Sequence, residues 1–194
     1  MTVARKRAAQ ARRGKADHDA LVLLTADHNE IDKLVREFER QRQAGDTVEK
    51  GKAALRICHA FEVYAAIKHE VLYPAADAVL TGEDKELLGK SQLQHDEIQD
   101  LIEKVENTPA NDPSFDSAMA VLAEQAARLM KQEEEKLFPR LRHSRLDLLG
   151  TGERMAARKT ELGTRPIDRE RVRQARKVMR PLRQPKPLRS VDTP

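Results

Sequence analysis

The chain repeats one pair of motifs in the same order, and this repeat limits its fold more than any other feature. His-Asn-Glu-Ile at 28–31 is matched by His-Asp-Glu-Ile at 95–98, and His-Glu-Val-Leu-Tyr-Pro at 69–74 by Glu-Glu-Lys-Leu-Phe-Pro at 134–139. The leading histidine precedes the closing proline by 46 residues in one half and by 44 in the other. That length holds a helix, a turn and a second helix, so the repeat predicts two helical hairpins.

The composition favours a helical protein with one core and basic ends. Of the 194 residues, 35% are charged, 3% are aromatic and none is Trp, which is unusual for a sheet-rich domain. Residues 1–15 carry a net charge of +6 and residues 150–194 of +8, which leaves −10 on residues 16–149. We therefore divide the chain into a basic, disordered arm (1–15), a helical bundle (16–149) and a basic extension (150–194). We expect this extension to be helical near 153–162 and 167–180 and then mobile.

The chain carries no sequence signal for an oxidising compartment or a membrane. Cys58 is the only cysteine, so an internal disulfide framework is excluded. No apolar segment of a secretory signal follows the basic N-terminal residues, and no run approaches the roughly 20 apolar residues of a membrane helix. We expect a cytoplasmic protein without membrane contact.

Apolar residues recur at three- and four-residue spacing in four segments, as in amphipathic helices. Asp17 or Asp19 can cap the first segment, Gly45 ends it, and the second segment runs up to Pro74. A loop at 107–113, with two prolines, separates the third segment from the fourth. The pattern predicts an all-α, up-down-up-down antiparallel four-helix bundle with short extra helices and a mobile C-terminal tail. Its apolar positions include Leu21, Leu24, Ile31, Phe38, Leu55, Cys58, Phe61, Leu72, Leu88, Leu93, Ile98, Ile102, Met119, Leu122, Leu129 and Leu137.

Several of these segments resemble the hemerythrin-like, or HHE cation-binding, proteins. The resemblance rests on Leu-Leu-Thr-Ala-Asp-His-Asn-Glu-Ile at 23–31, the Leu-Tyr-Pro and Leu-Phe-Pro endings at 72–74 and 137–139, and Arg-Lys-Thr-Glu-Leu at 158–162. It covers residues 17–162. The family resemblance implies a four-helix bundle with a dinuclear iron site bridged by carboxylates. It also implies a role in handling or sensing dioxygen, nitric oxide or peroxide.

The sequence departs from the family at the positions that would hold the metal. The family has a histidine ten residues before the first proline and a glutamate six before it, where this chain has Tyr64 and Lys68. It has a histidine ten residues before the second proline, where this chain has Leu129. The family's carboxylates are kept as Glu133 and Glu134. Each iron of a dinuclear site would therefore lose at least one imidazole.

Three interpretations of this remodelled site stay open. A single iron or manganese ion could be held by a mixed nitrogen and oxygen set, in which a tyrosine can serve as a phenolate ligand to ferric iron. A metal-free core could form instead if Lys68 pairs with Glu133 or Glu134, because an ammonium repels a dication from a low-dielectric interior. A dinuclear iron site is the third. The candidate metal ligands are His28, Tyr64, His69, His95, Glu133 and Glu134, with His69 included because a small helix rotation would turn it inward.

Other functional classes have less support in the sequence. The chain contains no Gly-x-Ser-x-Gly, phosphate-binding loop or dinucleotide glycine pattern, so no hydrolase, transferase or dinucleotide-enzyme motif is present. The basic ends could contact nucleic acid, but no aromatic residue lies between their basic residues to stack on bases. The family resemblance implies a small gaseous or peroxide ligand as a partner, and we expect no membrane contact.

Overall fold

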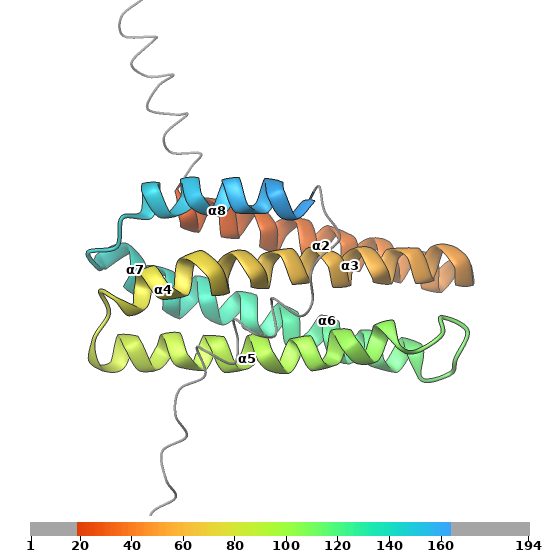
Figure 1. Cartoon of the computed structure of the whole chain (residues 1–194). Helices are drawn as coiled ribbons and strands as arrows, with labels where there is room; N and C mark the ends of the chain where they lie inside the picture. The colour runs from red at the N-terminus through yellow and green to blue at the C-terminus, as the bar shows by residue number, and fades with distance from the viewer. Residues whose placement is uncertain (1–18, 164–194) are drawn as a thin grey trace, which may run out of the picture.

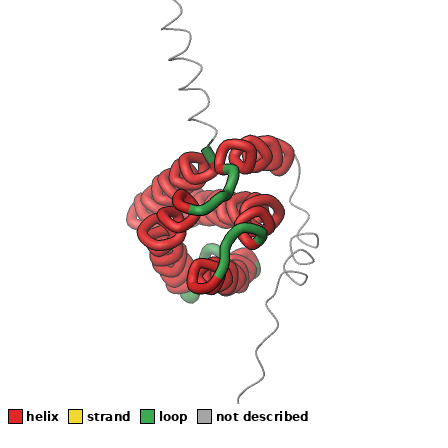
Figure 2. Tube along the Cα trace, turned by 90° about the vertical axis from the view of Figure 1, so that its left-hand side faces the viewer, coloured by secondary structure: helices red, strands yellow, loops and turns green. Residues whose placement is uncertain are grey.

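The computed structural model describes residues 19–163, and over this range it is all-helical (Figure 1). The all-α class is thus confirmed, and the arrangement is consistent with the hemerythrin fold. The basic arm at 1–15 and the helical piece at 167–180 lie outside the described residues. Four long helices lie side by side around a common interior (Figure 2), namely α2 (Ala20–Ala44), α3 (Thr47–Ile67), α5 (Gly82–Glu106) and α6 (Phe115–Gln132).

Local signals in the sequence set the ends of the first two helices. Asp19 is the N-cap of α2, and its side chain accepts a hydrogen bond of 2.8 Å from the backbone N–H of Leu21. Gly45 ends α2 with φ 73°, a left-handed conformation that glycine adopts without a steric cost. Asp46 then caps α3 through the N–H groups of its first turn. Because only these two residues join α2 to α3, the two helices are antiparallel neighbours.

A short π-helical turn interrupts the long helix in each half of the chain just before its proline. These turns are η1 (Lys68–Leu72) and η2 (Glu133–Leu137), and they continue into α4 (Tyr73–Asp77) and α7 (Phe138–His143). The backbone N–H of the next residue bonds five residues back, to the carbonyl of Lys68 in one turn and of Glu133 in the other. Proline has no N–H and collides with the carbonyl four residues before it, so it favours a wider turn at this point.

The interior is filled mainly by the aliphatic and aromatic residues that the periodicity selects. Leu24, Phe61, Ile102 and Leu122 are all buried. Two positions were predicted wrongly, because Leu55 and Leu93 are 55% and 46% exposed. Spacing alone places a residue near the apolar stripe, but it does not settle whether another helix covers that position.

One further helix, α8 (Leu148–Gly163), packs along the outside of α2 and α3 (Figures 1 and 2). It buries Met155 and Leu162 against the same core. The helical piece expected at 153–162 lies within it. The division of the chain between residues 149 and 150 stays a prediction, although α8 spans that point. No helix among residues 19–163 has the length and apolar content needed to cross a membrane.

Candidate functional site

A buried ammonium group lies at the centre of the candidate site. Lys68 begins η1 and is 0% exposed. Its Nζ atom pairs with Oε1 of Glu133 and lies 2.9 Å from Nε2 of His95 and 3.3 Å from the hydroxyl oxygen of Tyr64. Its Nζ also lies 4.8 Å and 5.1 Å from the ring centroids of Tyr64 and Tyr73, within the range of a cation–π contact.

Glu133 is the ion-pair partner of Lys68 and the main hydrogen-bond acceptor of the site. It begins η2 and accepts hydrogen bonds from Lys68, from the Tyr64 phenol and from the Ser91 hydroxyl. Burial alone would raise the pKa of this carboxyl, but the Lys68 ammonium and the nearby histidines hold the pKa well below its usual range. Burial lowers the pKa of Lys68 to about 8, although Glu133 opposes that shift. Both partners of the pair are therefore charged at neutral pH.

Two histidines take part in the hydrogen-bond network of the site. Nε2 of His28 lies 2.6 Å from the Tyr64 hydroxyl, whose own proton is donated to Glu133, and Nδ1 of His28 lies 2.6 Å from Oε1 of Glu134. Both ring nitrogens of His28 thus have a polar partner within hydrogen-bond distance. His95 contacts the Lys68 ammonium through Nε2, which is the acceptor because an ammonium group only donates.

Both buried tyrosines remain phenols in this environment. Burial, reinforced by the negative charge of Glu133, raises the pKa of Tyr64 well above its ordinary value. The same two causes raise the pKa of Tyr73. The phenolate form, which one of the three interpretations requires as a ligand for ferric iron, is therefore disfavoured at position 64 in the absence of a metal ion.

The π-turn places His69 in the interior beside Lys68. Its side chain is buried, and its ring centroid lies 5.0 Å from that of Tyr73 and 6.0 Å from that of His95, in edge-on geometry. In a regular α-helix, the side chains of residues 68 and 69 would point in directions about 100° apart around the helix axis. These two ring contacts place His69 next to the polar centre, in which the other candidate ligands contact Lys68 or one another.

Two polar residues of this cluster were missed in the sequence. Ser91 bonds to Glu133 and lies 3.2 Å from the hydroxyl of Tyr73. Ser91 stands four residues before His95 on α5, so its helical spacing was a signal that could have been used. Tyr73 was recognised only as part of the Leu-Tyr-Pro motif at 72–74, because the sequence of that motif does not indicate the direction of the phenol side chain.

The arrangement around Lys68 resembles a cation site in which the cation is an ammonium. An imidazole lone pair from His95, a carboxylate oxygen from Glu133 and the hydroxyl oxygen of Tyr64 converge on one atom, the Nζ of Lys68. These are the donor types that iron or manganese prefers. Between residues 19 and 163, no group of three or more His, Cys, Asp or Glu side chains is placed to hold a metal ion. A dinuclear iron centre does not fit these residues while Lys68 holds this position.

Two ionic contacts hold α8 beside the site. Lys159 pairs with the buried Asp27, which precedes His28, and Arg158 binds Glu70 through two nitrogens at 2.5 and 3.1 Å. Burial raises the pKa of Asp27, although Lys159 opposes the shift. From outside the four long helices, α8 thus binds Asp27 and Glu70, which are the sequence neighbours of the candidate ligands His28 and His69.

The fold and the site together define an all-helical bundle with a polar centre of histidine, tyrosine, lysine and glutamate in its interior. Residues 19–141 match the family described as the Hemerythrin HHE cation binding domain. The chain belongs to this family, and membership indicates a metal-binding protein. The matched range contains every candidate ligand but ends before α8. No curated protein and no solved structure gave a match.

Proposed function

We propose that this protein is an up-down-up-down hemerythrin-family bundle whose interior works without iron, because the Lys68 ammonium takes the position of the cation. It would then act as a structural or interaction module. The observation that supports this proposal is the contact of Lys68 Nζ with Glu133, His95 and Tyr64 at once. No other cationic side chain described in residues 19–163 is completely buried.

The electrostatics of the core favour this reading over a dinuclear centre. Two unit charges about 4 Å apart interact by roughly 4 kcal/mol at an effective dielectric constant of 20, and a dication beside the ammonium would meet about twice that repulsion. A metal could enter only if Lys68 moved away or lost its proton. The pair with Glu133 and the hydrogen bond to His95 both oppose that movement.

Family membership supports a second candidate function, which is the binding of a single iron or manganese ion. The contacts that favour it are those of His28 with Tyr64 and Glu134, because these groups already lie together without Lys68 between them. Such an ion would supply a binding position for dioxygen, nitric oxide or peroxide. His95, Glu133 and His69 are the remaining candidate ligands in this reading.

Metal analysis of the purified full chain separates the two candidates. The protein is produced in iron- and manganese-supplemented medium and measured by elemental analysis and visible spectroscopy. We expect far less than one metal ion per chain and no absorption from a phenolate–iron complex. One ion per chain that is lost in Glu133→Gln would contradict the metal-free proposal.

A designed variant provides the matched positive control. Lys68→Glu combined with Tyr64→His restores two family residues and removes the repelling charge. We expect this double variant to bind iron more tightly than the natural chain, with its helical circular dichroism retained. If the folded variant gains no metal, then residues 64, 68, 95 and 133 do not form the shared cavity that the proposal assumes.

A further inference from the structure

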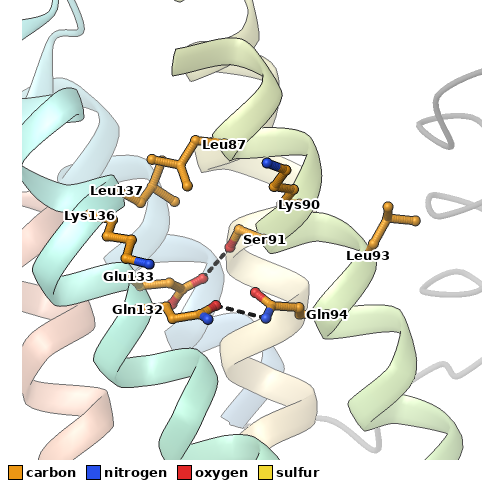
Figure 3. A pocket seen from close by; sticks show the side chains of 9 residues that line it. All are labelled: Leu87, Lys90, Ser91, Leu93, Gln94, Gln132, Glu133, Lys136 and Leu137. Carbon is orange, nitrogen blue, oxygen red and sulfur yellow. Dashed lines mark hydrogen bonds between the residues drawn. The ribbon is translucent and has the colours of Figure 1, made fainter. Parts of the chain in front are cut away.

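A pocket opens beside the polar centre, between α5 and the continuous helix formed by α6 and η2 (Figure 3). Its volume is about 500 Å³, which is the size of pockets that hold small organic ligands. The pocket reaches inward to Ser91 and Glu133, two residues of the candidate site. The inner end of the pocket is therefore formed by the hydrogen bond between Ser91 and Glu133, whose side chain is 1% exposed.

Two lysines face this pocket from opposite walls. Lys90 comes from α5 and Lys136 from η2, and Figure 3 shows the two ammonium groups pointing into the space between the helices. Neither lysine forms an ion pair with any residue between 19 and 163, although many other lysines of this range do. The two charges are thus available to a ligand.

The remaining walls supply apolar surface and amide groups. Leu87 and Leu137 line the same side of the pocket in Figure 3. Gln94 and Gln132 bridge the two helices lower in the pocket through a hydrogen bond of 2.7 Å. A ligand placed here would contact leucine side chains along its body and lysines at its charged end.

The charge at the inner end does not oppose an anion, because Glu133 is already neutralised. Its carboxylate is paired with Lys68 and accepts hydrogen bonds from Tyr64 and Ser91. The net charge that a ligand meets is therefore set by Lys90 and Lys136. Without Lys68, an anionic Glu133 would weaken the attraction.

We propose that this pocket binds a small amphipathic anion, with its carboxylate or phosphate group between Lys90 and Lys136 and its apolar body against Leu87 and Leu137. The proposal rests on the proposed function in one respect, since Lys68 rather than a metal neutralises Glu133. It deepens that function by giving the interaction module a chemical class of ligand.

Titration calorimetry on the full chain tests this proposal with three probes of similar size. Phenylacetate and phenyl phosphate carry the two candidate anionic groups, and benzyl alcohol is neutral. We expect one or both anions to bind with one site per chain, while benzyl alcohol binds at least tenfold more weakly. The stronger of the two anions identifies the group that the lysines prefer. No binding by either anion, or equal binding by benzyl alcohol, would overturn the proposal.

Variants of the lysines locate the binding site. Lys90→Met and Lys136→Met should each weaken anion binding by about two- to fivefold, as expected for losing one exposed ionic contact. Lys131→Met is the matched control, because Lys131 lies one turn earlier on α6, is exposed and does not line the pocket. Equal affinity in the natural chain and in the combined Lys90 and Lys136 variant would place the ligand elsewhere and refute the assignment.

The metal content of the same samples separates this proposal from the preceding one. If the chain contains stoichiometric metal but anion binding still depends on Lys90 and Lys136, the pocket proposal holds and the metal-free proposal fails. If the chain is metal-free and the lysine variants bind the anion as tightly as the natural chain does, the metal-free proposal holds and the pocket proposal fails.

Discussion

Lys68 and Glu133 stand at equivalent positions in the two halves of the chain and form an ion pair with each other. Each is the first residue of a π-turn and lies six residues before a proline. Their side chains are 0% and 1% exposed. The internal repeat has thus placed opposite charges at its two matching positions, and the pair joins the halves at the centre of the bundle.

Removal of the ammonium should destabilise the protein strongly. Lys68→Met keeps most of the side-chain volume but leaves Glu133 as a buried carboxylate without its counter-charge, which typically costs about 3–5 kcal/mol. Urea denaturation followed by circular dichroism measures the free energy of unfolding. Lys52→Met is the control, since its pair with Glu49 is exposed and should contribute little to stability. Equal losses in the two variants would contradict a buried ionic pair.

The pKa of Lys68 predicts how stability changes with pH. Its folded-state pKa is about 8, below the usual value of 10.5 for lysine. Between these values the unfolded chain binds more protons, so the free energy of unfolding should rise with pH by up to about 1.4 kcal/mol per unit. Stability measured from pH 7.5 to 10 in the natural chain and in Lys68→Met tests this. A rise that persists unchanged in the variant must come from other groups.

Loss of the Tyr64 hydroxyl should loosen the same network. Tyr64→Phe removes the donor to Glu133 and the acceptor for His28, at an expected cost of about 1–3 kcal/mol. Tyr73→Phe is a milder comparison, because the hydroxyl of Tyr73 forms one hydrogen bond among the residues of the site, with Ser91 at 3.2 Å. Thermal unfolding of both variants ranks the two contributions. A larger loss for Tyr73→Phe would mean that Tyr64 does not occupy the central position.

The ionic contact between α8 and α2 should show strong coupling. Lys159→Met leaves the buried carboxylate of Asp27 without its partner, at an expected cost of about 1–2 kcal/mol. Asp27→Asn removes that charge, so the double variant should recover most of the loss. A double-mutant cycle on the free energy of unfolding gives the coupling directly. Additive effects would show that the two side chains do not interact in solution.

The repeat and the helical periodicity predicted most of the architecture, because both depend on local spacing. A pairing of Lys68 with Glu133 or Glu134 was one of the interpretations drawn from the sequence, because an inward carboxylate needs a cation, and the structure pairs Lys68 with Glu133. The contact between Asp27 and Lys159 was not, because 132 residues separate them and no repeat relates them. The exposure of Leu93 could not be predicted either, as it depends on the space left between α5 and its neighbours.

The two π-turns make the composition of the interior sensitive to chain length. Each turn accommodates one residue more than a regular α-helical turn would, at the point where the chain enters the polar centre. Deletion of one residue within 69–71 would restore regular winding and rotate everything on one side of the deletion by about 100° relative to the other. Single-residue insertions and deletions at these two points could therefore exchange which side chains line the centre, without replacing any amino acid in it.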